Sequence, residues 1–310
     1  MHDLSAGKYI DASQTLIKES SKETELAPKH LILSLGKLSH IAQLDLDTFE
    51  STQAQQDIEA TDDKLDLISI HGKLLELFGT QLSETGENID ILDLEEKVAK
   101  ITDVVASRLN LPNLINHFHN LIRGLYNGKA LNAEDLVDLL TLKDNFLEQV
   151  TDYASAIDVC VRAKDVPDRR AHSSLKSIWR RVYLRDDWPM LNNTTGMNDN
   201  ELGDNLRQSA LYATIQLASE NDHPEALFLS PKKSFNKLSE KDLSARFPSL
   251  PQDEVAAILS DLQEENARLE SLIKNNNLDN WYKEVLRLHS EDHPKYQVAK
   301  DEQEQEMDES

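Results

Sequence analysis

Residues 177–188 read SIWRRVYLRDDW and hold two of the three tryptophans in a 310-residue chain that is only 5% aromatic. Arginines among aromatic side chains can line a groove for single-stranded nucleic acid. At about 100° per residue, however, the apolar residues from Leu175 to Val182 share one helical face. The stretch therefore predicts an amphipathic helix over about 171–187 with Trp179 in the core.

The charged residues of this helix allow two interpretations. Arg180, Arg181 and Arg185 are expected to project from its flanks and far side, where they could contact nucleic acid or pair with acidic neighbours. We favour pairing, because the surrounding segments are acidic. Asp186 and Asp187 stand at the C-terminal end, where carboxylates oppose the helix dipole by a few tenths of a kcal/mol. We expect them to cap or pair locally.

Composition narrows the class of protein. The chain carries 56 acidic and 33 basic residues, a net charge of -23, which repels a polyanion over most of the surface. Nine glycines and nine prolines are typical of a helical chain rather than a β-sandwich. The only cysteine, Cys160, is predicted to be a buried, inert thiol. No segment approaches the ~20 apolar residues of a membrane span. We expect a soluble, intracellular, all-α protein.

Apolar periodicity predicts helices throughout and no strand. An Asp-x-x-Glu signal at Asp93 and Glu96 and a similar one at Ser239 mark helix starts, whereas Gly79 is expected to stop a helix. No fixed repeat period is present. The expected helices cover residues 5–20, 26–44, 55–79, 93–109, 111–126, 133–142, 144–163, 171–187, 199–220, a short one from 239, 251–276, and 278 to about 293.

Motifs for chemistry are missing. The sequence contains no phosphate-binding glycine loop, nucleophile elbow or zinc-protease motif. His117 and His119 point about 160° apart on a helix, which disfavours a shared metal. The loop from Asn198 resembles a calcium loop, but Ser209 takes the place of its bidentate glutamate. Glu-x-x-His pairs for a di-iron bundle are also missing. We expect no enzyme activity, no metal and no cofactor.

Residues 255–273 could form a coiled coil. Glu265 interrupts the apolar seam, and the run is shorter than the three to four heptads that a coiled coil requires. Packing within the domain is the better interpretation.

The segment 26–44, LAPKHLILSLGKLSHIAQL, is apolar around most of its circumference. Such a helix must be enclosed by neighbours. Either the following helix covers it or a partner protein does; for any single residue we favour packing within the chain. Its apolar residues form one stripe (Leu31, Leu35, Leu38, Ala42), a second stripe (Leu26, Leu33, Leu44) and a further side with Ile32.

Several stretches together resemble the C-terminal helical domain of the nucleoporin 133 family, most closely in its fungal form. The most telling are LSLGKL at 33–38 and RDDW at 185–188, the latter followed by a polar loop. The resemblance extends to about residue 293 and omits the connector at 45–60 and the acidic tail. The stretches that carry it are AGKYIDASQTL, HLILSLGKLSHIAQL, SIWRRVYLRDDW, RFPSLPQDEV and NLDNWYKEVLRL.

The resemblance implies a scaffold subunit of the Y-shaped complex of the nuclear pore, at the nuclear envelope. It implies an irregular, extended, α-solenoid-like stack of helices that docks onto the tail of nucleoporin 107 and supports pore assembly and nucleocytoplasmic transport. The chain would be a C-terminal fragment, without the family's N-terminal propeller, so no membrane contact is implied. The alternative is a helical adaptor or vesicle-coat-like scaffold outside the pore.

The predicted organisation has three parts. Residues 1–165 form an N-terminal helical part with a partner-docking edge, 166–293 a C-terminal helical part, and 294–310 a disordered acidic tail, with Pro167 at the joint. The docking edge is placed on the second helix. Its expected anchors are apolar and its expected rim is charged: Leu26, Ile32 and Leu33 as anchors, and Glu25, Lys29 and Lys37 as the rim.

Overall fold

The computed structural model describes residues 5–44, 52–86, 92–144, 151–192, 199–221 and 223–293. Within these ranges the regular elements are all helices, and the only β-type pairing is one isolated bridge between Glu25 and Lys129. The all-α prediction is confirmed. None of the described helices has both the length and the apolar character that crossing a bilayer requires.

The chain divides into two compact units. Unit 1 comprises residues 1–144 and 159–171, and unit 2 comprises residues 145–158 and 172–310. The joint predicted near Pro167 stays a prediction, and the predicted tail lies outside the described residues. The helices are α2 (Tyr9–Ser20), α3 (Leu26–Leu44), α4 (Thr52–Glu84), α5 (Leu94–Val105), α6 (Pro112–Tyr126), α7 (Ala133–Leu142), α8 (Thr151–Arg162), α9 (Asp168–Arg185), α10 (Trp188–Leu191), α11 (Asp199–Arg207), α12 (Ala210–Glu220), η3 (Glu225–Leu227), η4 (Pro231–Ser234), α13 (Glu240–Arg246), α14 (Gln252–Asn276) and α15 (Leu278–Asp292).

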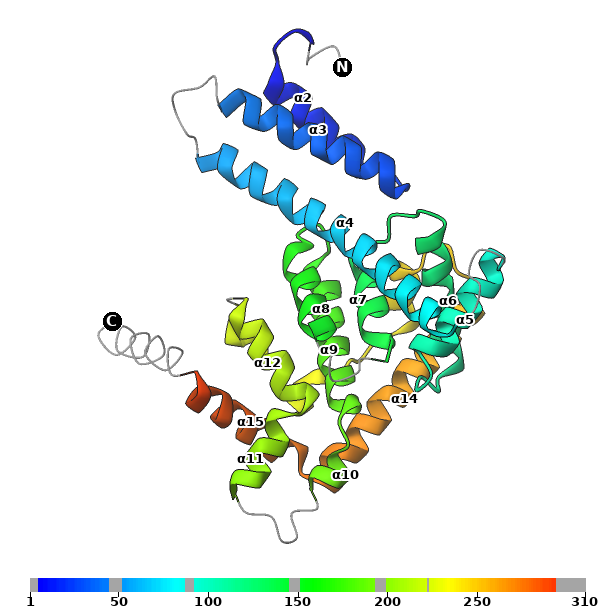
Figure 1. Ribbon diagram of the computed structural model, residues 1–310, viewed down its shortest axis with the longest axis vertical. Coiled ribbons are helices and arrows are strands. Elements are labelled where there is room, and N and C mark those ends of the chain that lie inside the picture. The colour runs from blue at the N-terminus through cyan, green and yellow to red at the C-terminus, as the bar shows by residue number, and fades with distance from the viewer. Residues whose placement is uncertain are drawn as a thin grey trace, which may run out of the picture. The chain divides into compact units, whose positions relative to one another are not determined.

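In unit 1 the long helix α4 is the element on which the others pack. The hairpin of α2 and α3 lies along its N-terminal half, and α5, α6 and α7 pack on its C-terminal half (Figure 1). Phe78 of α4 and Phe118 of α6 are fully buried and meet edge to face, with ring centroids 6.5 Å apart. Burial of aromatic rings of this kind dominates the energetics of a core, so this contact fixes α6 on α4.

Local start signals were predicted correctly. Asp93 accepts the Glu96 N–H at 2.8 Å while the Glu96 side chain accepts the Asp93 N–H, and Ser239 and Asp242 make the same reciprocal pair. Each pair satisfies two backbone donors that a helix start leaves open. The start of α14 after Pro251 also agrees with the prediction.

The predicted stop at Gly79 is wrong, because α4 continues to Glu84. Glycine ends a helix only where the backbone adopts the left-handed conformation, and here that residue is Gly86, at φ 76°. The last turn is retained because it buries Leu82, which is 1% exposed. Burying a leucine contributes about 1.5–3 kcal/mol, more than the ~1 kcal/mol that a mid-helix glycine costs.

Two other predicted boundaries need correction. The single helix expected over 199–220 is two, α11 and α12, because Ser209 accepts the Tyr212 N–H and caps a new start. A side-chain cap in place of a helical turn favours a break. The helix expected over 93–109 ends at Val105. The start of the helix expected from residue 144 lies outside the described residues.

The core of unit 2 is built around α9, and the two tryptophans of the opening stretch lie in it. Trp179, Tyr183 and Trp188 are all fully buried. The Trp179 indole N–H donates to the Leu227 carbonyl at 2.7 Å, and the Tyr183 hydroxyl donates to the Leu229 carbonyl at 2.7 Å. Buried aromatics with a polar atom need such partners. The prediction that Trp179 fills the core is confirmed.

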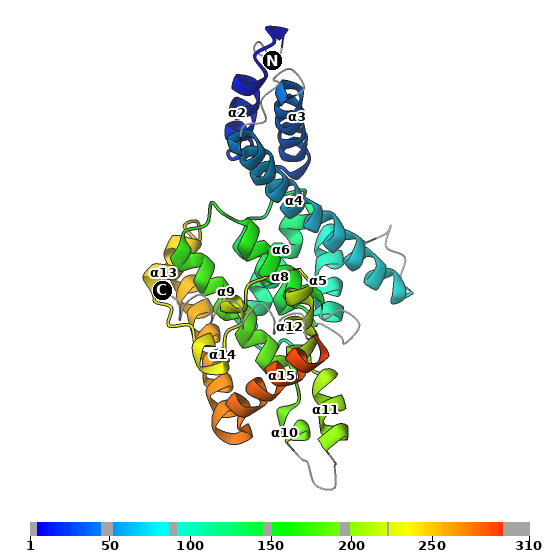
Figure 2. The same cartoon turned by 90° about the vertical axis from the view of Figure 1, so that its left-hand side faces the viewer.

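The predicted outward position of Arg180 and Arg181 is wrong, and their pairing with an acidic neighbour is confirmed. They are 0% and 5% exposed, and both bind Glu265 of α14, which is itself buried. Figure 2 shows α14 next to α9, with α15 following at its end. Burial opposes the charged form of Glu265, but the two guanidinium groups outweigh it and hold the pKa of Glu265 below its usual value. Glu265, which interrupts the apolar seam of α14, therefore forms ion pairs between α14 and α9.

The two aspartates at the end of α9 act as caps, as expected. Asp186 accepts the N–H groups of Ala210 and Leu211 at 2.8 and 3.2 Å and so holds the start of α12. Asp187 accepts the Met190 N–H at the start of α10. Asp187 lies at the N-terminus of α10 and Asp186 at the N-terminus of α12, where the helix dipole favours negative charge.

Candidate interaction surface

The hairpin of α2 and α3 is packed closely because a glycine lies at the crossing. A Cβ added at Gly36 would lie 3.3 Å from Cγ1 of Ile17 and 3.5 Å from Cβ of Leu16. Only a residue without a side chain allows this approach. Beyond the crossing, the Ser13 hydroxyl faces Nδ1 of His40 at 3.5 Å, and both residues are buried.

The side of α3 that carries Leu33 faces the chain's own helices. Leu33 is 0% exposed, and Lys37 forms an ion pair with Asp62 of α4. Lys29 is half-buried, with its amino group 3.5 Å from the Glu23 carbonyl, and burial lowers its pKa. These contacts make the Leu33 side of α3 part of the core of unit 1.

The tip of the hairpin is tied to the turn between α6 and α7. The Leu26 N–H donates to the Gly128 carbonyl at 2.7 Å, and the Ala130 N–H donates to the Thr24 carbonyl at 2.8 Å. Gly128 has φ 73°, a conformation that residues with a Cβ adopt only at a cost. Two backbone hydrogen bonds therefore fix the N-terminal end of α3 against the turn between α6 and α7.

A histidine of α4 also forms a hydrogen bond with the chain just after this turn. Nε2 of His71 accepts the Leu131 N–H at 2.9 Å, while Nδ1 lies 3.0 Å from the Leu67 carbonyl. The ring must therefore be neutral, with its proton on Nδ1. Burial, assisted by the charge of Lys29, lowers the pKa of His71 below 6.5.

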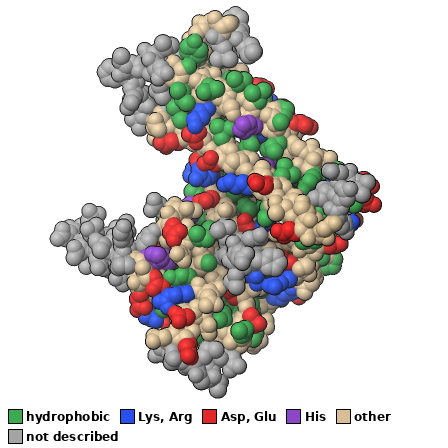
Figure 3. Space-filling model, in the orientation of Figure 1, with side chains coloured by type: hydrophobic (Ala, Val, Ile, Leu, Met, Phe, Trp, Pro, Cys, Tyr) green, Lys and Arg blue, Asp and Glu red, His purple; other side chains and the backbone are tan. Residues whose placement is uncertain are grey.

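In the described part of the chain, the opposite side of α3 exposes apolar side chains. Leu31, Leu38 and Ile41 are 59%, 62% and 37% exposed, and the half-buried Leu35 lies beside them. Successive residues turn by about 100°, which places Leu33 about 200° from Leu31. We call Leu31, Ser34, Leu38 and Ile41 the outward face of α3. Figure 3 shows hydrophobic side chains gathered over this hairpin.

The outward face carries no charge. The only charged residues of α3 are Lys29 and Lys37, and both lie on the side turned towards the core of unit 1. In a chain with 29% charged residues, a solvated helix face would normally carry several of them. An exposed aliphatic helix face without charged residues is a common feature of protein–protein interfaces, which makes the outward face of α3 a candidate interaction surface.

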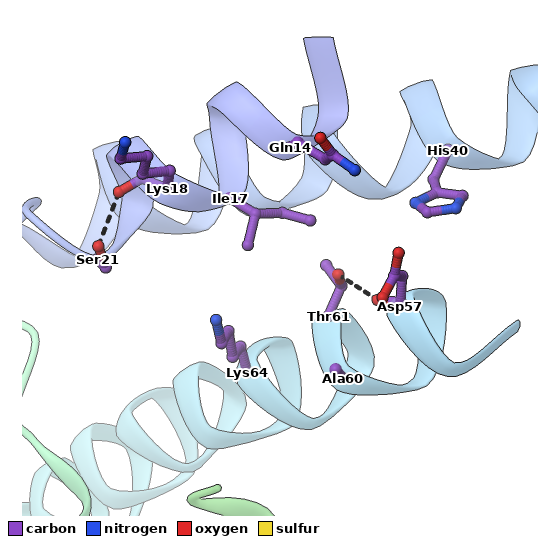
Figure 4. Close-up of a pocket in the computed structure, with 9 residues that line it drawn as sticks. All are labelled: Gln14, Ile17, Lys18, Ser21, His40, Asp57, Ala60, Thr61 and Lys64. Atoms are coloured by element: carbon purple, nitrogen blue, oxygen red, sulfur yellow. Dashed lines mark hydrogen bonds between the residues drawn. The ribbon is translucent and has the colours of Figure 1, made fainter. Parts of the chain in front are cut away.

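A shallow groove lies on the other side of the hairpin, between α2 and α4. Its volume is about 360 Å³, and Figure 4 shows Ile17 of α2 facing Ala60 and Thr61 of α4 across it, with His40 at one end. Lys64 on one wall and Lys18 at the rim add positive charge. No residue of the outward face of α3 lines this groove, so the two features are separate.

The predicted site residues thus occupy different environments. The structure places Leu33 inside the core and leaves Leu26 and Ile32 half-buried, while Glu25 is exposed beside the bridge to Lys129. Leu33 has no surface to offer another chain unless the helices separate. The other roles stay predictions. The sequence pattern shows the Leu31 stripe as well, but the predicted anchors are Leu26, Ile32 and Leu33.

Other candidates for chemistry have structural explanations. Nε2 of His117 lies 3.1 Å from a carboxylate oxygen of Asp138, and both side chains are buried. Cys160 is half-buried, and burial raises the pKa of its thiol to about 12, which disfavours the reactive thiolate. Among the described residues no group of three or more His, Cys, Asp or Glu side chains is arranged to hold a metal ion.

An all-α chain whose most unusual surface is an uncharged apolar helix face belongs to the class of helical assembly proteins. The comparisons with known proteins specify the class. Residues 1–284 match the family model described as non-repetitive/WGA-negative nucleoporin C-terminal, and the chain belongs to that family. Nucleoporins are the proteins of the nuclear pore complex in the nuclear envelope.

Two fungal relatives agree with this assignment. The chain is 23% identical to "Nucleoporin nup132" of Schizosaccharomyces pombe over 298 residues, which cover 91% of the chain and 24% of the relative. It is 24% identical to "Nucleoporin NUP133" of Chaetomium thermophilum over 294 residues, 90% of the chain and 21% of the relative. The chain therefore spans about a quarter of the length of these curated relatives. The resemblance noted from the sequence is confirmed.

Proposed function

We propose that this chain is a non-enzymatic scaffold subunit of the Y-shaped complex of the nuclear pore, and that it docks through the outward face of α3 onto the helical tail of a nucleoporin 107-type partner. One observation carries the docking: Leu31, Leu38 and Ile41 are exposed on a helix face that has no charged residue. Family membership supports the pore, and the resemblance of the sequence to the nucleoporin 133 family supports the partner.

The geometry suits a partner helix. The exposed leucines are seven residues apart, which is two helical turns, or about 10 Å along α3. An apolar stripe at this spacing packs against a matching stripe by inserting side chains between those of the partner. Large aliphatic side chains at the centre of such an interface supply most of the binding energy, with the polar rim excluding water.

The test is co-precipitation of this chain with the helical tail of nucleoporin 107. In the variant Leu31→Glu/Leu38→Glu, two charges would have to be buried against the partner, and we expect at least a tenfold weaker interaction. Met190→Glu is the matched control, because Met190 is 71% exposed on unit 2 and outside the proposed surface. It should bind as the unchanged chain does.

Three results would contradict the proposal. Unchanged binding of the double variant would mean that another surface docks. Equal losses in the double variant and in Met190→Glu would mean that the effect is not local. If the unchanged chain fails to bind this tail but co-purifies with components of a vesicle coat, the adaptor function outside the pore replaces the proposed one.

A further inference from the structure

We infer that the acidic C-terminal segment of this chain, residues 301–310, docks on a basic patch of unit 2 formed by Lys232, Lys233, Lys237 and Lys283. The segment reads DEQEQEMDES, with six carboxylate side chains and no lysine or arginine. The positive charge of this patch on unit 2 complements the negative charge of the segment. The proposed contact is independent of the docking through α3.

Most cations of unit 2 are already paired, whereas three of the patch lysines are not. Arg207 binds Asp292, and Arg287 binds Glu284 and Glu291. Among the residues that the structure describes, Lys233, Lys237 and Lys283 form no ion pair, and all three are exposed. These three ammonium groups are therefore available to bind carboxylates.

Contacts within unit 2 place Lys232 and Lys233 of η4 beside the start of α15, which carries Lys283, and Lys237 follows three residues after the end of η4. The Lys232 amino group pairs with Asp279 at the start of α15 at 2.6 Å, and Lys283 follows Asp279 by one helical turn. The Asn236 side chain donates to Ser173 of α9 at 2.8 Å, which fixes the backbone next to Lys237. With Asp279 counted, the patch carries a net charge of about +3.

The route from the last described helix to the patch is short enough. The end of α15 is fixed, because Asp292 accepts hydrogen bonds from Arg207 at 2.7 and 2.9 Å and from the Tyr212 hydroxyl at 2.6 Å. From there back to Asp279 is about 20 Å along the helix. Residues 294–300 can span about 23–25 Å when extended, so the acidic residues after them can lie over the lysines.

The occupant is the chain's own tail rather than a separate acidic peptide because it is tethered. A short linker that spans the distance holds the segment at a millimolar effective concentration, so several weak, exposed ion pairs can act together. The bound tail would occupy the patch and keep other polyanions from it. Because the pairs are exposed, salt should weaken the contact.

A spin label on the tail tests this directly in the full-length chain. Cys160→Ala removes the native thiol, and Ser310→Cys accepts a nitroxide that broadens the NMR signals of nearby methyl groups. At low salt we expect the Leu238 methyls, adjacent to Lys237, to lose roughly half of their intensity or more, while those of Leu31 in unit 1 are unaffected. At ~0.5 M salt the broadening should fall severalfold.

Two variants with the same change of charge give the control. Lys233→Glu/Lys237→Glu/Lys283→Glu should abolish the broadening, whereas Lys8→Glu/Lys73→Glu/Lys164→Glu, three exposed lysines of unit 1, should leave it unchanged. A chain whose six tail carboxylates are replaced by the corresponding amides alters no described residue, so it keeps the test valid if the first variant misfolds. It should also lose the broadening.

The inference is overturned by any of three outcomes. Broadening of equal size at Leu31 and Leu238 would mean that the tail samples the surface at random. Broadening that survives both the lysine reversal and the neutral tail would mean that charge does not hold the tail. Broadening seen only between labelled and unlabelled molecules in a mixture would assign the contact to a second copy of the chain.

Discussion

The Arg180 guanidinium and the Glu265 carboxylate are both buried and are joined by two hydrogen bonds of 3.0 and 2.6 Å between α9 and α14. Arg181 binds the other oxygen of the same carboxylate at 3.0 Å. Such a group of charges contributes little net stability when it is complete, but it is costly to break, because the remaining charge has no water around it. The pair therefore fixes the register of two helices far apart in sequence.

Glu265→Leu should destabilise unit 2 by about 3–5 kcal/mol, because it leaves two guanidinium groups in the core without their carboxylate. The measurement is chemical denaturation of the variant beside Glu264→Leu. Glu264 is adjacent in sequence, exposed, and paired only with Arg268 one turn away. Its loss should change stability by no more than ~0.5 kcal/mol. Equal effects of the two changes would show that the buried pair has no special role.

Two glycines should respond to alanine with opposite signs. Gly128 has φ 73° in the turn that binds the tip of the hairpin, so Gly128→Ala should destabilise unit 1 by about 1–2 kcal/mol. Gly79 lies inside α4 with open space where a Cβ would go, so Gly79→Ala should stabilise the chain by about 0.5–1 kcal/mol. Thermal unfolding of both variants measures these two changes in stability. Changes of the same sign would refute this interpretation of the backbone.

The stability of unit 1 should depend on pH through His71. Its folded pKa lies below 6.5, so the unfolded chain takes up a proton more readily. The contribution of the neutral ring is complete above pH 6.5 and is lost as the pH falls from there towards the folded pKa. The free energy of unfolding, measured between pH 7.5 and 5.5, should decrease less in His71→Gln than in the unchanged chain. His30→Gln, an exposed histidine of α3, is the control and should keep the full dependence.

The two sides of α3 should differ in what a charge does to the fold. Leu33→Asp places a carboxylate in the core of unit 1 and should cost about 3–5 kcal/mol. Leu38→Asp alters a side chain that is 62% exposed and should change the stability by less than ~0.5 kcal/mol. Denaturation followed by circular dichroism measures the free energy of unfolding of both variants. A large loss in Leu38→Asp would mean that the outward face is covered within the chain.

These two sides also show how far the sequence could predict the site. Both apolar stripes are visible in the residue pattern, but their orientation depends on where α2 and α4 pack, which is set by long-range contacts such as Gly36 against Ile17. The charged Lys37 suggests an exposed rim, although its amino group binds Asp62 of α4. The same limit applies to Arg180, whose partner is 85 residues away.

Local signals were more informative about the fold. The capping residues Asp93 and Ser239 predict the starts of α5 and α13, because the hydrogen bonds involved lie within four residues. The stop at Gly79 could not be predicted reliably, since the conformation of a glycine depends on whether the next turn buries an apolar side chain. Here Leu82 does so. Local sequence signals thus determine which segments form helices. Where a helix ends, and which of its sides faces the core, depend on tertiary contacts.

The most direct test of the docking is hydroxyl-radical footprinting of side chains, in the free chain and in its complex with the helical tail of nucleoporin 107. Oxidation of Leu31, Leu38 and Ile41 should fall several-fold in the complex, because a partner helix excludes water from them. Oxidation of Val104 and Met190, exposed elsewhere, should not change. Undiminished oxidation of Leu31 and Leu38 in a complex that has demonstrably formed would contradict the account.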